Sequence, residues 1–180
     1  ISKKIEIKKK FKIVLDCGNG SGGILGPEIL RKYSSELIEL FCEVDGNFPN
    51  HHPDPSEPKN LLNLIETVKI EGADLGIALD GDGDRLGVVD SEGEIIFPDR
   101  YLALMAEDTL KKNKSGKIVF DVKCSNQLDK VIRENDGVPI MTKTGHSFIK
   151  SEIARTDAVL GGEMLSLIHI SEPTRPIAIA

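Results

Sequence analysis

The sequence predicts an α/β protein made of two three-layer α/β/α units, each with a mixed, largely parallel sheet, the second unit being truncated. Three observations predict this fold class. Short apolar runs rich in valine, isoleucine and leucine alternate with segments of helical periodicity, which is the order found in parallel-sheet proteins. The alternation starts again after about residue 97. The composition, with 39% hydrophobic and 29% charged residues in a chain of 180, is that of a globular protein.

The first unit, residues 1–97, is expected to begin with a buried strand over 11–17. This strand ends at the glycine-rich turn 18–23, and Pro27 marks the start of a helix that ends near Ser34, since proline favours the first helical position. The later elements are expected to be a strand over 36–43, an irregular proline-rich loop over 45–58, a helix over 60–71, and strands over 73–79, 86–90 and 94–97.

The second unit, residues 98–164, is expected to begin with a helix over 99–112, with Asp99 as its N-cap. The following elements are expected to be a strand over 117–122, a helix over 126–135, a strand over 138–142, a helix over 147–155 and a strand that begins at 158–160. The alternation stops in residues 165–180, which resemble translated sequencing-adapter read-through. We expect this tail to be non-native and do not assign a catalytic role to His169.

Charge and cysteine content exclude several classes of protein. The net charge is −6 and the pI is near 5.3, with no concentrated basic patch, so we expect no nucleic-acid partner. No apolar run approaches the length of a membrane span. The three cysteines are odd in number and lack metal-ligand spacing, which favours reduced thiols in a cytoplasmic protein. The chain opens on Ile1, so we expect it to begin inside a longer protein. The sequence does not predict the oligomeric state.

The stretch DGDGDR places Asp80, Asp82 and Asp84 directly after a predicted buried strand. Two unit charges about 4 Å apart at an effective dielectric constant near 20 repel by about 4 kcal/mol, so three converging carboxylates need a cation among them. Oxygen ligands favour Mg²⁺ or Ca²⁺. An exposed acidic turn is the simpler alternative. An EF-hand is excluded, because Arg85 and Ser91 stand where its pattern requires glycine and glutamate.

Arg85 points to phosphate. A guanidinium beside a metal already neutralised by carboxylates is explained if a phosphate bridges the cation and the arginine. The alternative is a surface salt bridge to Asp84 or Asp90. The pair therefore favours phosphoryl chemistry.

The turn 18–23 also satisfies the dinucleotide fingerprint, with Gly18, Gly20 and Gly23 spaced as G-x-G-x-x-G and Glu43 about 20 residues later. An NAD-dependent Rossmann oxidoreductase is therefore an alternative function. A tight strand-to-helix turn requires the same glycines, and a nicotinamide site does not explain DGDGDR. We favour the structural role. A P-loop is excluded, because no Walker lysine follows.

Polar clusters also end the strands predicted for the second unit. Lys123 and His146 follow two of these strands and are candidates to contact an anionic substrate or to relay a proton. Glu163 ends the third and is a candidate to bind hydroxyl groups. Taken singly, Lys123 has the alternative of an exposed lysine and His146 that of a helix cap beside Ser147.

Together these motifs resemble the α-D-phosphohexomutase family, in its bacterial phosphomannomutase/phosphoglucomutase branch. The resemblance runs from about residue 11 to 164 and is carried by VLDCGNGSGG, CEVDGNFPNHHPDPSEP, ALDGDGDRLGVVD, FDVKCS, KTGHS and GGEM. It implies that Asp80, Asp82 and Asp84 are Mg²⁺ ligands and that Arg85 contacts a catalytic phosphoserine. It also implies substrate-binding positions at Lys123, Thr144, Gly145, His146 and Glu163, with catalytic roles for Arg85, Lys123 and His146.

The function implied by the resemblance is Mg²⁺-dependent interconversion of mannose or glucose 6-phosphate and 1-phosphate, through a phosphoserine and a bisphosphate intermediate. The family's phosphoserine loop belongs to an upstream domain, and residues 165–167 replace the Ser-Gly-His that follows GGEM in the family. We therefore expect a fragment that is inactive alone. The alternatives are the Rossmann oxidoreductase, a non-catalytic divalent-metal-binding module and, within the family, phosphoglucosamine mutase.

Overall fold

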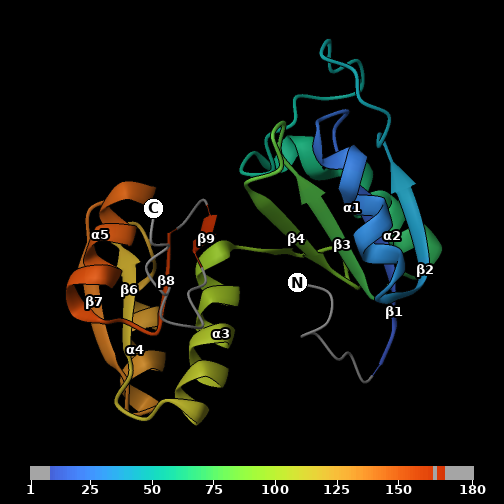
Figure 1. Ribbon diagram of the computed structural model, residues 1–180. Helices are drawn as coiled ribbons and strands as arrows, with labels where there is room; N and C mark the ends of the chain where they lie inside the picture. The colour runs from blue at the N-terminus through green and yellow to red at the C-terminus, as the bar shows by residue number, and fades with distance from the viewer. Residues whose placement is uncertain (1–8, 164–165, 169–180) are drawn as a thin grey trace, which may run out of the picture. The chain divides into compact units, whose positions relative to one another are not determined.

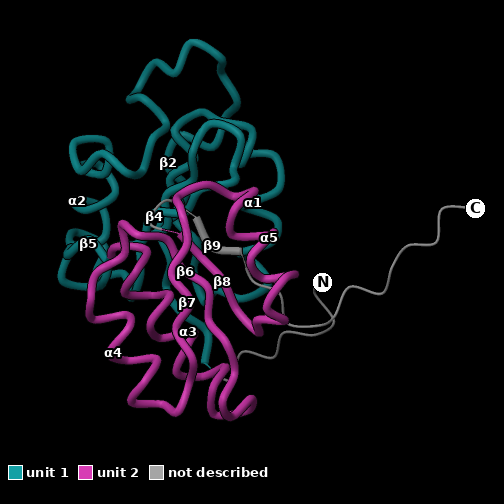
Figure 2. The backbone as a smooth tube through the Cα atoms, turned by 90° about the vertical axis from the view of Figure 1, so that its left-hand side faces the viewer, with its two compact units in different colours: residues 1–96 teal, residues 97–180 magenta. Residues whose placement is uncertain are grey.

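The computed structural model describes residues 9–163 and 166–168. The chain divides into two compact units, residues 1–96 and 97–180, which Figure 2 shows in teal and magenta. Within the described part of the chain, every helix is too short or too polar to span a bilayer.

Unit 1 is built on a five-stranded sheet, sheet A, in the order β2-β1-β3-β4-β5. Its central strand β1 is parallel to both of its neighbours, and the pairs β3–β4 and β4–β5 are antiparallel. The strands are β1 (Phe11–Asp16), β2 (Ser34–Leu40), β3 (Leu75–Leu79), β4 (Leu86–Asp90) and β5 (Ile95–Ile96). Because β1, β2 and β3 run parallel, the loops that follow them meet at one edge of the sheet.

Two helices cover opposite faces of sheet A (Figure 1). The helix α1 (Gly22–Arg31) packs its glycines against Leu15 and Leu79. The helix α2 (Leu62–Glu71), which follows the short 3₁₀ helix η1 (Pro58–Leu61), packs against the alternate residues of the strands, including Val14 and Ala78. Alternate strand residues point to opposite faces, so unit 1 has three layers.

Unit 2 is built on a four-stranded sheet, sheet B, in the order β7-β6-β8-β9. The strand β6 is parallel to β7 and β8, and β9 is antiparallel to β8. Apolar residues of α3 and α4 share one core with Ile118, Phe120 and Leu160, and α5 packs with Val119 on the other face. The elements are α3 (Pro98–Lys112), β6 (Lys117–Asp121), α4 (Asn126–Glu134), β7 (Val138–Thr142), α5 (His146–Thr156), β8 (Leu160–Glu163) and β9 (Ser166–Ile168). The predicted fold class, two α/β/α units with largely parallel mixed sheets, is confirmed.

Two predictions about helix starts are wrong. The helix α1 begins at Gly22, five residues before Pro27, because the glycines of its first turn pack closely on Leu79 and on the backbone of Cys42. Asp99 is not the N-cap of α3, which is Phe97. Instead, Asp99 lies in the first helical turn and accepts a hydrogen bond from the backbone N–H of Ser125 at 3.1 Å.

The expected non-native tail lies mainly outside the described residues, and so does His169. Its described part is the short strand β9, which pairs with β8.

Candidate functional site

The loop after β3 gathers the three predicted metal ligands. Asp80, Asp82 and Asp84 each offer a carboxylate oxygen, and these oxygens lie within 4.8 Å of one another. Asp80 is buried, at 2% exposure, while Asp82 and Asp84 are exposed. Gly83 turns the loop with a φ of 79° and donates its N–H to the Asp80 carbonyl at 3.1 Å. A compact set of oxygen donors that is open to solvent on one side fits a hard divalent cation such as Mg²⁺.

Arg85 lies directly against this cluster. Its backbone N–H and its Nε both donate to the Asp80 carboxylate, at 3.0 and 2.7 Å. Its Nη1 donates to Asp54 at 3.3 Å, and its Nε lies 3.9 Å from a carboxylate oxygen of Asp84. The main partners are therefore Asp80 and Asp54 rather than Asp84 or Asp90. Asp54 is not among the site residues that the sequence predicted, because it lies 31 positions before Arg85.

Two carboxylates that contact Arg85 have lowered pKa values. Burial alone would raise the pKa of Asp80. The hydrogen bonds from Arg85 have the opposite effect and outweigh it, so this pKa lies below its usual value. The pKa of Asp54 is also lowered, because hydrogen bonds from Ser56 and the charge of Arg85 outweigh its burial. Both carboxylates are therefore held in the charged form, the form in which they can bind a cation or keep Arg85 in place.

The glycine-rich turn after β1 packs against the loop of residues 80–84, which carries the three predicted metal ligands and is called the metal loop below. Ser21 donates its backbone N–H and its Oγ to the carbonyl of Gly81, at 2.9 and 3.2 Å. A Cβ added at Gly20 would lie 2.7 Å from the same oxygen. The backbone N–H groups of Gly18, Asn19 and Gly20 are also donated within the chain. A pyrophosphate needs such N–H groups pointing at it, so the structural role of this turn fits the geometry better than dinucleotide binding does.

In unit 2 the carboxyl ends of β6, β7 and β8 bring most of the predicted substrate residues together. The Glu163 carboxylate, at 4% exposure, accepts the backbone N–H of Gly145 at 2.9 Å and lies 2.9 Å from His146 Nε2. The Thr144 hydroxyl donates to Asp121 at 2.8 Å. Gly145 has a φ of 129°, which favours glycine and lets the chain turn into α5. Lys123 follows β6 at the same edge and is exposed.

Asp121 belongs to the polar cluster predicted at the end of β6, but the sequence assigned it no role. It ends β6, is fully buried, and accepts from Thr144 and from the Cys124 thiol at 3.0 Å. Burial raises the pKa of Cys124, and the hydrogen bond to Asp121 adds to the effect, so this thiol stays protonated as a donor. The available signal was an aspartate placed as the last residue of an apolar strand.

The fold and these two loop edges define a pair of α/β/α domains with charged loops at the carboxyl ends of their strands, where α/β proteins usually bind ligands. Comparison with protein families gives the same division. Residues 1–93 match the model described as phosphoglucomutase/phosphomannomutase, alpha/beta/alpha domain II, and residues 97–175 match the model for domain III. The chain belongs to the phosphoglucomutase/phosphomannomutase family.

Curated relatives and a solved structure agree with this assignment. The chain is 51% identical over 168 residues to a phosphomannomutase/phosphoglucomutase of Pseudomonas putida and, over the same length, to a phosphoglucomutase of Neisseria meningitidis serogroup A. Each match covers 93% of this chain and 36% of the relative, so the chain spans about a third of their length. A crystal structure of a family protein from Burkholderia thailandensis is similar with a TM-score of 0.91 and 46% identity, over 94% of this chain and 37% of that one.

Proposed function

We propose that this chain carries the metal-binding loop and sugar-phosphate-binding loops of a phosphomannomutase/phosphoglucomutase. The whole enzyme would interconvert the 6-phosphate and 1-phosphate of mannose or glucose through a hexose bisphosphate. The observation that carries the proposal is the cluster of Asp80, Asp82 and Asp84 with Arg85 at the carboxyl edge of sheet A. The catalytic phosphoserine implied by the family would come from a part of the enzyme that these residues do not include.

The three aspartates would hold Mg²⁺, which would offset negative charge on the phosphoryl group in transit. Arg85 would bind that phosphoryl group. The contacts of the guanidinium with Asp80 and Asp54 fix its position. A guanidinium has five N–H donors, and a bidentate hydrogen bond to phosphate needs only two, so enough donors remain for the phosphate. Since the anchors are carboxylates, the guanidinium is already oriented before the phosphate arrives, which lowers the reorganisation needed during the reaction.

The loops of unit 2 would bind the sugar phosphate. The Glu163 carboxylate fixes the Gly145 backbone and the His146 ring, so that both are held at the edge where hydroxyl groups and phosphate would bind. Thr144 is held in the same way by Asp121. Lys123 would supply positive charge for the phosphate, and His146 would take part in binding and proton transfer.

Among the alternatives, the relatives named above favour the phosphomannomutase/phosphoglucomutase branch over phosphoglucosamine mutase. The Rossmann oxidoreductase is disfavoured because the backbone N–H groups of residues 18–21 already donate hydrogen bonds within the chain, that of Ser21 to the metal loop. A non-catalytic metal module would bind a cation and have no affinity for sugar phosphates. We propose a cytoplasmic location on the basis of the free thiols of Cys17, Cys42 and Cys124.

Two titrations test this proposal. Calorimetry with Mg²⁺ should show one site in the chain. Asp84→Asn should weaken this site strongly, while Asp136→Asn, at an exposed position of unit 2, should leave it intact. Glucose 6-phosphate, added with Mg²⁺ and followed by amide chemical shifts, should move the signals of Gly145 and His146. Metal binding without any response to sugar phosphates would instead favour the non-catalytic module.

A further inference from the structure

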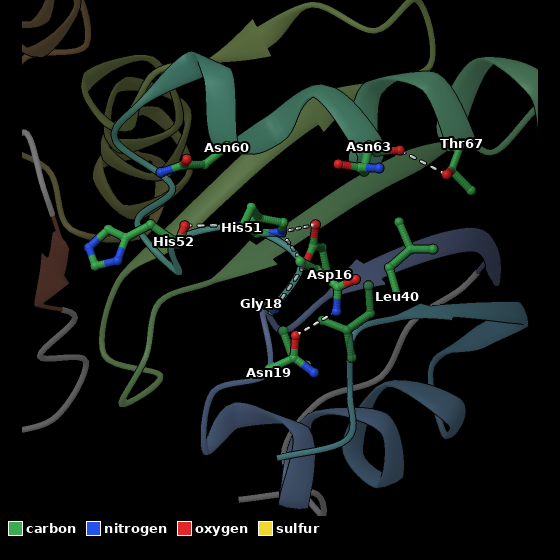
Figure 3. Close-up of polar contacts among 12 residues, drawn as sticks. Asp16, Gly18, Asn19, Leu40, His51, His52, Asn60, Asn63 and Thr67 are labelled. Atoms are coloured by element: carbon green, nitrogen blue, oxygen red, sulfur yellow. Dashed lines mark hydrogen bonds and ion pairs between the residues drawn. The ribbon is translucent and has the colours of Figure 1, made fainter. Parts of the chain in front are cut away.

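A buried carboxylate with no role in the proposed reaction lies at the end of β1, next to the turn that packs against the metal loop. Asp16 is the last residue of β1 and is 1% exposed. Its carboxylate accepts the backbone N–H of Gly18 at 2.8 Å and lies 3.0 and 3.2 Å from Nε2 of His51. Figure 3 shows this carboxylate between the backbone of Gly18 and the ring of His51. The Asp16 side chain thus holds the turn after β1 and the loop that contains His51, which are far apart in the sequence.

The ring of His51 has contacts at both of its nitrogens and with a neighbouring aromatic ring. Its Nδ1 lies 3.0 Å from the carbonyl oxygen of His52, and the ring makes a T-shaped contact with Phe41, with 5.4 Å between ring centroids. The side chain is 13% exposed. A carbonyl oxygen can only accept, so Nδ1 is the donor in the contact with His52, and Nε2 faces the Asp16 carboxylate. The imidazole is therefore held in one orientation.

Both segments held by Asp16 form hydrogen bonds with the backbone of the same residue, Gly81, in the loop of Asp80, Asp82 and Asp84. On one side, the turn that begins at Gly18 reaches Ser21, which donates to the Gly81 carbonyl. On the other side, the loop that contains His51 continues to Pro53, whose carbonyl accepts the Gly81 N–H at 3.2 Å. Gly81 lies between Asp80 and Asp82, so its position sets where both carboxylates start.

The contacts between these segments leave little room for adjustment. A Cβ added at Gly18 would lie 2.9 Å from Cβ of Pro53 and 3.2 Å from Cε1 of His51. Closely packed groups transmit a displacement instead of absorbing it. Burial also raises the pKa of Asp16, against the opposing effects of Gly18 and His51, so a charged carboxylate here is unfavourable for the fold. Packing alone does not require a carboxylate at this position.

We propose that Asp16 and His51 are positioning residues for the Asp80, Asp82 and Asp84 cluster. They act by holding the two segments that bond to the N–H and to the carbonyl of Gly81. This inference rests on the proposed metal site. Loss of the His51 ring should loosen the loop at Pro53 and Gly81 and weaken cation binding about tenfold, the lower end of the effect typical for groups that orient metal ligands.

The test measures binding of Mn²⁺ to the full chain by electron paramagnetic resonance, at a temperature where every variant is folded. His51→Leu should bind about tenfold more weakly, and His51→Gln, which keeps a donor towards Asp16, should recover most of the affinity. His52→Gln is the matched control on the neighbouring ring. Val68→Ala lowers the stability of unit 1 from a buried site in α2 and should leave the affinity unchanged. If His51→Leu does not fold, Asp16→Asn, which has nearly the same shape, takes its place.

The outcomes separate the two claims. Absence of Mn²⁺ binding in the unsubstituted chain would overturn the proposed metal site, and this inference with it. The inference alone would be overturned if the unsubstituted chain binds Mn²⁺ and His51→Leu, or Asp16→Asn in its place, binds it equally well. An equal loss of affinity in Val68→Ala would also overturn it, because the effect would then follow stability and not position.

Discussion

Replacement of Asp82 by asparagine should have opposite effects on the stability of unit 1 with and without a divalent cation. The ligand oxygens of the cluster lie within 4.8 Å of one another, and Asp82 and Asp84 are exposed. At that separation in water, each pair of charges repels by about 1 kcal/mol, and Asp82 takes part in two such pairs. Arg85 offsets part of this repulsion. Without a cation, Asp82→Asn should therefore stabilise unit 1 by about 1 kcal/mol at low ionic strength.

With Mg²⁺ the order should invert. A cation at a hundred times its dissociation constant stabilises the native state by about 2.7 kcal/mol, and a hundredfold weaker site gains only about 0.4 kcal/mol. Urea unfolding in EDTA and in Mg²⁺ measures both effects. The chain has no tryptophan and two tyrosines, so in a Tyr101→Phe background the fluorescence of Tyr33 reports on unit 1 alone.

The control is Glu92→Gln, which removes one negative charge from the exposed turn after β4. It should respond to Mg²⁺ like the unsubstituted chain. High salt should erase the gain of Asp82→Asn in EDTA, because the repulsion is screened. If Asp82→Asn destabilises unit 1 in EDTA, or gains as much from Mg²⁺ as the unsubstituted chain, the three carboxylates do not form a cation site.

Three further predictions concern the fold. Gly23→Ala should destabilise unit 1 by about 1–3 kcal/mol in urea unfolding, because its Cβ would overlap the carbonyl oxygen of Cys42, whereas Gly46→Ala, with open space around it, should be nearly neutral. An aromatic disulfide reagent should label Cys42 first at neutral pH, because its contact with Cys17 lowers the pKa of this partly exposed thiol, and the other two thiols are buried. Earlier labelling of either buried thiol would contradict this. Burial raises the pKa of Tyr101 to about 12, so the stability contributed by its neutral phenol should be complete below about pH 10 and lost as the pH rises through 12. Tyrosinate absorbance would contradict this if Tyr101 ionised near pH 10.

Strands were the most predictable elements. The ranges 86–90 and 138–142 agree with β4 and β7, because each apolar run ends at residues that favour turns. The start of α1 was less predictable. Proline favours the first helical position, which pointed to Pro27, but the close approach of Gly22 and Gly23 to Leu79 and Cys42 begins the helix earlier. Tertiary packing here outweighs local preference.

Within the candidate site, predictability depended on sequence distance. Asp80, Asp82 and Asp84 belong to one short loop, so their spacing alone indicated a cluster, and the geometry brings their oxygens together. The sequence assigned no role to Asp54 or Asp121, because their partners Arg85 and Thr144 are 31 and 23 positions away. These two contacts depend on the tertiary structure and not on a local pattern.

The most direct test of the proposed function is a chimera in which residues 11–163 replace the matching segment of the Pseudomonas putida relative. If these loops carry the metal and sugar-phosphate machinery, the chimera with Mg²⁺ should convert glucose 1-phosphate to glucose 6-phosphate, followed by coupled NADPH formation. The same chimera with Asp82→Asn should fold and lose most of this activity. A folded chimera that binds Mg²⁺ but does not turn over, or one whose activity survives Asp82→Asn, would contradict the account.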